Sequence, residues 1–264
     1  MKFLVQQQPV FVYTGGKDFD ATKPSVVFIH GTANDHSVWT LQARYFAHHG
    51  WNALAPDLPG HGKSFGDAKT SIAASADWLM NLLDNGGIAS AALVGHSMGS
   101  LIALDAAARY PSRISQLALI GTSLPMPVSD TLMDAALNRP GEAMDMLNIW
   151  GLAPQLKWGK NATPGTSTMM AGARLLAQSH PGAMAKDLAA CLAFELDDAI
   201  LAAIATPTLV VAGANDLLTP AKAAKALAAR LTNVRMLTLP EAGHCMMQEA
   251  PDKLLDALKG FLRP

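Results

Sequence analysis

Cysteine is scarce in this chain of 264 residues, which contains only two. Cys191 and Cys245 lie far apart and are not flanked by histidines at ligand spacing, which argues against a zinc site and a disulfide framework. Charged residues make up only 16%, and their signs nearly cancel to a formal net charge of -1. Since no basic run is present, we expect neither a nucleic-acid partner nor an anionic membrane surface.

Long apolar runs are also missing. The N-terminal segment 1–5, which reads Met-Lys-Phe-Leu-Val, is followed at once by the polar stretch 6–9, so its apolar part is too short for a signal peptide. No other run is long enough to cross a membrane, and we therefore predict a soluble, cytoplasmic protein. Half of the residues are hydrophobic, which suffices for a large core in one domain or one domain with an insertion. The oligomeric state is not encoded in these features.

What the sequence does contain is a regular alternation of strands and helices. A nearly continuous apolar run, typical of a strand buried on both faces, occurs at 25–29, and further short strands are expected at 52–55, 91–94, 116–120, 207–212 and 234–239. Helical spacing occurs at 39–49, 71–83, 98–110, 220–231 and 245–262. Two β-like patches at 3–5 and 10–13 precede them as an antiparallel edge. The alternation predicts an α/β fold, with a mostly parallel central sheet and helices on both faces.

The alternation stops between 123 and 196. This segment has no convincing strand, and its helical pieces at 130–137, 141–150, 168–177 and 182–193 are separated by proline, glycine and a polar loop at 157–166. We predict a helical lid at 123–196, inserted into a core domain formed by 1–122 and 197–264. The lid is rich in methionine, and Met133, Met144 and Met170 are candidates for an adaptable apolar substrate pocket. Alternatively, these side chains only pack the lid against the core.

One short motif joins a predicted strand to a predicted helix. Residues 95–99 read Gly-His-Ser-Met-Gly, between the apolar run 91–94 and the alanine-rich helix 98–110. Glycines at the two ends allow the strand and the helix to pass close together, which leaves Ser97 at a strained, protruding position. The free N–H groups of the helix N-terminus can stabilise an oxyanion beside it. Ser97 is thus a candidate nucleophile, the alternative being that it merely turns the chain.

A serine nucleophile needs a base, and the base needs a carboxylate to orient it. Asp216 follows the strand 207–212, and His244 follows the last strand, so both are expected at the carboxyl edge of the sheet together with Ser97. Asp216 could instead cap the next helix, and His244 could be a surface residue before the last one. Two other histidines, His61 and His96, are expected to be structural.

The chain order Ser, Asp, His, with the serine in a strand-turn-helix elbow, resembles the α/β-hydrolase fold over essentially the whole length. Further stretches match that family: His-Gly-Thr at 30–32, Asp-Leu-Pro-Gly-His-Gly-Lys-Ser at 57–64 and Gly-Ala-Asn-Asp at 213–216. The resemblance implies a catalytic triad of Ser97, Asp216 and His244. It also implies an oxyanion hole built from the backbone N–H groups of Thr32 and Met98, with Thr32 in contact with the substrate.

The resemblance implies a serine hydrolase that forms an acyl-enzyme and needs neither a metal nor an organic cofactor. A serine nucleophile disfavours haloalkane dehalogenase and epoxide hydrolase activity, which use an aspartate. The expected substrate is a small-molecule carboxylic ester with a small to medium apolar acyl group. Thioesterase, lactonase and carbon-carbon bond hydrolase activities remain alternatives, and so does a ligand receptor that hydrolyses little.

Overall fold

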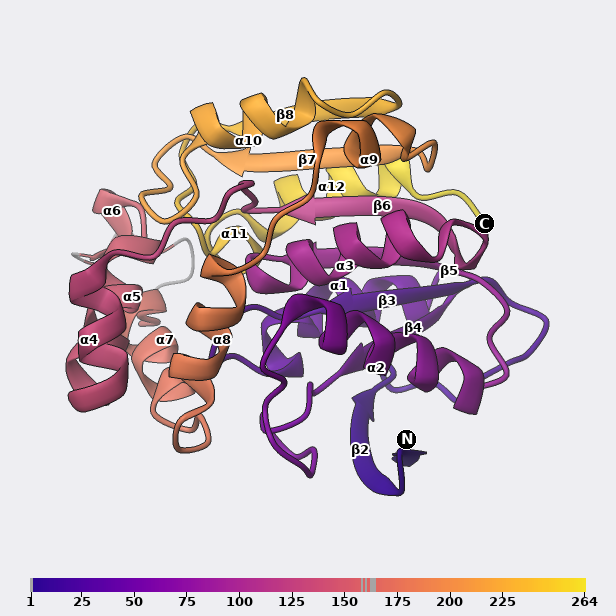
Figure 1. Ribbon diagram of the computed structural model, residues 1–264, viewed down its shortest axis with the longest axis horizontal. Helices are drawn as coiled ribbons and strands as arrows, with labels where there is room; N and C mark the ends of the chain where they lie inside the picture. The colour runs from indigo at the N-terminus through magenta and orange to yellow at the C-terminus, as the bar shows by residue number, and fades with distance from the viewer. Residues whose placement is uncertain (1, 158, 160, 162–164) are drawn as a thin grey trace.

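The computed structural model describes residues 2–157, 159, 161 and 165–264, and it contains an eight-stranded sheet (Figure 1). The strands in chain order are β1 (Lys2–Val5), β2 (Gln8–Tyr13), β3 (Ser25–Ile29), β4 (Asn52–Pro56), β5 (Ala91–His96), β6 (Ile114–Ile120), β7 (Thr208–Gly213) and β8 (Val234–Leu239). Their spatial order is β1-β2-β4-β3-β5-β6-β7-β8. The pairs β1–β2 and β2–β4 are antiparallel and all others are parallel, so both the predicted antiparallel edge and the parallel core are confirmed.

The strands β3, β4, β5 and β7 are buried at every residue, which explains why their sequences are mostly apolar. Their side chains alternate between two separate cores. In β3, Val27 and Ile29 belong to the core under the helices α2 (Ile72–Asn85) and α3 (Met98–Arg109). Val26 and Phe28 belong to the opposite core, which α1 (Thr40–Ala47) and α12 (Pro251–Phe261) cover. The expected helices on both faces are therefore present.

A group of helices between β6 and β7 stands apart from these layers. The group consists of α4 (Asp130–Asn138), α5 (Pro140–Gly151), α6 (Pro154–Lys157), α7 (Thr168–Leu176) and α8 (Ala183–Leu192), called the inserted helices below. They lie together beyond the arrowheads of β6 and β7, at the carboxyl edge of the sheet (Figure 1). Their small core includes Leu132, Leu176 and Leu188, and Ala33 of the β3–α1 connection joins it. Part of the predicted loop 157–166 lies outside the described residues.

Some elements differ from the sequence-based prediction. The helix expected at 245–262 is divided into α11 (Met246–Glu249) and α12, because Pro251 cannot continue a helix and begins the second one instead. The short helices α9 (Asp198–Ala203) and α10 (Ala221–Ala228) flank β7, and only α10 was expected. Two 3-10 turns, His36–Trp39 and Pro111–Arg113, complete the fold. Among the described residues, no helix has the length and apolar character needed to span a bilayer.

Candidate active site

The turn between β5 and α3 has the strained geometry that its motif predicts. Ser97 lies between the last residue of β5 and the first of α3 with φ of 54° and ψ of -122°, a backbone region that non-glycine residues rarely adopt. A β-carbon on Gly95 would collide with the carbonyl group of Gly99, and one on Gly99 would collide with the carbonyl groups of Ile29 and His30. Only glycine allows the strand and the helix to approach this closely.

Asp216 and His244, which are far apart in the sequence, form a buried pair. Nδ1 of His244 lies 2.8 Å from Oδ2 of Asp216, and the hydroxyl of Thr219 donates to the same oxygen at 2.7 Å. The other carboxylate oxygen accepts the backbone N–H groups of Leu218 and Thr219, each at 2.8 Å. Burial on its own raises the pKa of Asp216, but His244 and these hydrogen bonds outweigh it and lower the pKa below its ordinary value.

This arrangement settles how Asp216 relates to the helix that follows it. The carboxylate organises the turn before α10 through two backbone N–H groups, and at the same time it contacts His244. An ionised Asp216 places the His244 proton on Nδ1, which leaves Nε2 as a proton acceptor. The pair therefore has the chemistry of an oriented base.

A second histidine, His96, supports the backbone of the first. Its side chain is buried next to Ser97, and its Nε2 lies 2.9 Å from the carbonyl oxygen of His244. Burial, followed by the proximity of His244, lowers the pKa of His96 to about 3, so the ring is neutral and its proton is on Nε2. The structural role expected for His96 is thus that of a hydrogen-bond donor to the candidate base.

Glu249 holds the two residues that flank His244. Its carboxylate accepts the backbone N–H groups of Gly243, Cys245 and Ala153, each at 2.9 Å. Burial raises the pKa of Glu249, and the three N–H groups only partly oppose that effect. Ala153 follows the inserted helix α5, so this carboxylate ties the His244 loop to the inserted helices. Sequence reasoning missed Glu249, because its partners are backbone groups that carry no residue-type signal.

Ser97 and His244 line a common cavity of about 890 Å³, a volume that includes its opening to solvent. The side chains of Ser97 and His244 share no hydrogen bond in this structure, and such catalytic contacts are often long before substrate binds. The inserted helices contribute five leucines to the apolar lining: Leu132, Leu147, Leu175, Leu176 and Leu188. Three amide side chains, Asn34, Asn148 and Gln248, are the polar exceptions, together with Thr32 and Thr219.

The three methionines predicted for this pocket do not line the cavity. Met133 and Met144 pack against the small core of the inserted helices, and Met170 is 68% exposed. On α4 the neighbouring Leu132 lines the cavity instead of Met133, since consecutive helical residues point about 100° apart. The methionines that do line it, Met126 and Met247, lie outside the inserted helices. Composition indicated an apolar pocket, but it could not indicate which helix face would form it.

The two predicted oxyanion donors have the required free N–H groups. Met98 begins α3, so its N–H has no acceptor within the helix. In the part of the chain that the structure describes, neither this N–H nor that of Thr32 is hydrogen-bonded. The loop carrying Thr32 touches the elbow, because a β-carbon on Gly31 would lie 2.9 Å from the β-carbon of Ser97. Thr32 also lines the cavity.

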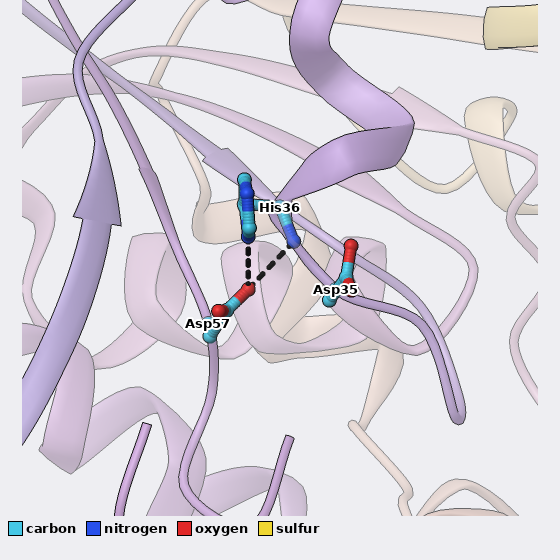
Figure 2. Close-up of side chains that lie close together, drawn as sticks. All are labelled: Asp35, His36 and Asp57. Atoms are coloured by element: carbon cyan, nitrogen blue, oxygen red, sulfur yellow. Dashed lines mark hydrogen bonds and ion pairs between the residues drawn. The ribbon is translucent and has the colours of Figure 1, made fainter. Parts of the chain in front are cut away.

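Asp35, His36 and Asp57 form a group of residue types that could hold a metal ion, with one potential ligand atom each within 4.8 Å of the others. Figure 2 shows that His36 points at Asp57, whose Oδ1 lies 2.7 Å from both the ring Nδ1 and the backbone nitrogen of His36. Oδ2 of Asp57 accepts the N–H of Lys63 at 2.8 Å. These bonds already occupy Nδ1 of His36 and both carboxylate oxygens of Asp57, and they hold the loop that runs to Lys63.

Comparison with known proteins places the chain among hydrolases. Residues 26–257 match the model of the alpha/beta hydrolase family. The chain is 28% identical, over 91% of its length and 99% of the relative's, to a pimeloyl-[acyl-carrier protein] methyl ester esterase of Aromatoleum aromaticum. It is 25% identical, over 90% and 89% of the two chains, to an (E)-2-((N-methylformamido)methylene)succinate hydrolase of Acinetobacter baylyi.

A solved structure shows the same fold. The enol-lactonase from Burkholderia xenovorans LB400 superposes with a TM-score of 0.88 at 22% sequence identity, and the match covers 99% of each chain. These relatives carry several different hydrolase names, so they agree on the fold and on hydrolysis more closely than on one substrate. The predicted resemblance is confirmed, and the chain belongs to the alpha/beta hydrolase family.

Proposed function

We propose that this hydrolase cleaves carboxylic esters through an acyl-enzyme formed on Ser97. The observation that carries the proposal is the shared cavity: Ser97, at a strained elbow, and His244, oriented by a buried Asp216, both line it. His244 Nε2 takes the proton of the Ser97 hydroxyl as the serine oxygen attacks the ester carbonyl. The backbone N–H groups of Thr32 and Met98 stabilise the oxyanion that forms.

The second half of the reaction returns Ser97 to its starting state. The protonated His244 donates its proton to the departing alcohol, which leaves the acyl group on the serine oxygen. Water then attacks the acyl carbonyl, and His244 accepts a proton from this water. The tetrahedral adduct collapses to the acid as His244 returns that proton to the departing Ser97 oxygen. Asp216 stabilises the imidazolium in both halves without itself becoming protonated.

We further propose that the inserted helices, as part of a lid at 123–196, select the acyl group. The leucines that they place around the cavity favour a small to medium apolar chain, and the described lining contains no Asp, Glu, Lys or Arg side chain. Asn148 adds one polar feature. Its side chain is 8% exposed, its amide nitrogen donates to the carbonyl of Met169 at 2.9 Å, and its oxygen receives no hydrogen bond from the described residues. A substrate hydroxyl or N–H group could donate to that oxygen.

Purified protein and Ser97→Ala should be compared on p-nitrophenyl esters, thioesters, lactones and diketones. The proposal predicts multiple turnover on short to medium esters, loss of nearly all of it in the variant, and labelling of wild-type Ser97 by a fluorophosphonate. Labelling at another residue would refute the assignment of the nucleophile. A single slow turnover would favour a ligand receptor. If thioesters, lactones or diketones were preferred, the proposed substrate would be that class and not the carboxylic ester.

A further inference from the structure

A buried carboxylate of the inserted helices reaches the loop that carries Thr32. Asp187, in α8, accepts the backbone N–H of Ala33 through its Oδ2 atom at 3.0 Å. One turn further along α8 lies Cys191, whose thiol interacts with the side chain of Thr32. A single helix therefore contacts two consecutive residues of this loop, the first of which is a predicted oxyanion donor.

The loop has a backbone conformation that needs such support. The N–H of Asn34 donates to the carbonyl of Gly31 at 3.2 Å and closes a four-residue turn with Thr32 and Ala33 at its centre. Ala33 has φ of 56°, a left-handed angle that glycine or asparagine usually supplies at this turn position. A hydrogen bond to the Ala33 N–H holds the peptide group between Thr32 and Ala33 in one orientation. This restricts the backbone of Thr32 and therefore the direction of the Thr32 N–H.

Asp187 is itself held in place by a second partner. Nε2 of His61 lies 2.9 Å from the same Oδ2 atom, and Nδ1 of His61 lies 3.0 Å from the carbonyl oxygen of Pro59. Both partners are acceptors, so each ring nitrogen carries a proton and His61 is an imidazolium. Burial alone lowers the pKa of His61, but the charge and hydrogen bond of Asp187 outweigh burial and raise it.

We propose that Asp187 is a positioning residue for the reaction, which holds the Thr32 N–H toward the oxyanion through its hydrogen bond to Ala33. The inference rests on the proposed function, since that N–H has this role only if Ser97 attacks an acyl carbonyl. It gives the inserted helices a part in transition-state stabilisation in addition to lining the cavity. Because the oxyanion forms only after attack, loss of the tie lowers kcat and leaves KM nearly unchanged.

The test compares wild type, Asp187→Ala and Asp187→Asn on p-nitrophenyl butyrate, and follows the rate of Ser97 labelling by a fluorophosphonate with mass spectrometry. Asp187→Ala should lower kcat by about 10- to 100-fold, with KM within about threefold, and should slow labelling by a similar factor. Asp187→Asn keeps an oxygen for the Ala33 N–H, so its kcat should return to within about fivefold of wild type.

A matched control removes a buried carboxylate elsewhere. Asp105 in α3 is buried like Asp187 and pairs with Arg109 at 2.6 Å on the same helix, so Asp105→Ala should lower the melting temperature without lowering kcat. Asp187→Glu keeps the charge beside His61 but displaces the oxygen from Ala33. It should fold even if the alanine variant does not, and its kcat should fall by about tenfold.

Two results would overturn the proposal: a kcat within about threefold of wild type in Asp187→Ala or in Asp187→Glu, or equal losses in the alanine and asparagine variants. Either would reduce Asp187 to a contribution to stability alone. Failure of wild-type Ser97 to react with the fluorophosphonate would instead refute the proposed function, and this inference with it. The labelling of wild type thus separates the two failures before any variant is compared.

Discussion

Among the described residues, two histidine–aspartate pairs have both side chains buried, and they differ in whether the second ring nitrogen of the histidine is hydrogen-bonded. His244 lies 2.8 Å from Asp216, and His61 lies 2.9 Å from Asp187. The second ring nitrogen of His61 is bonded to a backbone carbonyl, whereas Nε2 of His244 has no hydrogen-bond partner among the described residues, and His244 lines the cavity. An aspartate therefore makes a histidine a usable base only where the other nitrogen remains free; otherwise the pair is a buried ionic tie.

Replacing each histidine by alanine should separate the two pairs most strongly. We expect His244→Ala to lower kcat/KM by several orders of magnitude, on the scale seen when members of a catalytic triad are removed. His61→Ala should cost less than about 100-fold in turnover, but it should destabilise the fold by roughly 3–5 kcal/mol, because it leaves the buried charge of Asp187 uncompensated. Ester kinetics and urea unfolding of both variants measure the contrast. If both variants fold and lose turnover to a similar extent, the proposed difference between the two histidines is wrong.

The two aspartates provide a finer comparison, since both can be changed to asparagine. Asp216→Asn removes the charge that orients His244 and stabilises its protonated form, and kcat should fall by about 1,000- to 10,000-fold. Asp187→Asn retains the acceptor for Ala33 and should stay within about fivefold of wild type. Each variant is the control for the other, measured as kcat on one ester at one pH. If the two variants had nearly the same kcat, the roles assigned to Asp216 and Asp187 would be wrong.

Acid should weaken the fold through a different set of histidines. Burial lowers the pKa of His30 to about 4 and that of His96 to about 3, so both stay neutral in the folded protein while the unfolded chain binds protons below about pH 6.5. The unfolded state then carries more protons, and the free energy of unfolding should fall from pH 7 to pH 5, by up to roughly 1.4 kcal/mol per pH unit for each group.

His61 should act in the opposite direction, because its pKa is raised in the fold. Its contribution is complete below the ordinary histidine value and is lost as the pH rises through the raised one. Urea unfolding across pH 5–9 in wild type and in His61→Gln measures both trends. The free energy of unfolding of His61→Gln should still fall towards pH 5, but it should not show the fall at alkaline pH that the wild type shows. If the free energy of unfolding of the wild type did not fall between pH 7 and pH 5, His30 and His96 would not control the stability in acid.

The smallest effects are expected from side chains of the inserted helices. Leu147→Ala should enlarge the cavity and move the preferred p-nitrophenyl ester to a chain longer by one or two methylenes, each worth about 0.8 kcal/mol of burial. Met170→Ala is the matched control, since Met170 is 68% exposed and does not line the cavity. The measurement is kcat/KM from acetate to palmitate. If the preferred chain length shifted equally in both variants, Leu147 would not line the cavity as described. If kcat/KM were highest for palmitate, the protein would be a lipase.

Most of the fold could be read from the sequence, because its strands are short apolar runs whose neighbours in space follow from simple crossovers. The exceptions have local causes. Pro251 divides a helix whose apolar spacing continues on both sides of it. The sequence does not predict the short α9, because six residues show too little periodicity.

The candidate site was predictable only where a residue type carries its own chemistry. Ser97, Asp216 and His244 follow strands that end at one edge, so chain order suffices to bring them together. Asp187 and Glu249 gave no such signal. Both act by accepting backbone N–H groups, and which loop a lid helix faces depends on tertiary packing that no local pattern records.

Glu249 also has a consequence for hydrogen exchange. The amide protons of Ala153, Gly243 and Cys245 all bond to its carboxylate, although they come from two distant parts of the chain. An amide exchanges with deuterium only when its hydrogen bond opens, so these three should exchange slowly and at closely similar rates. After Glu249→Gln all three rates should rise together. The segment after α5 and the His244 loop would then behave as one unit of local unfolding, which opens from a single carboxylate.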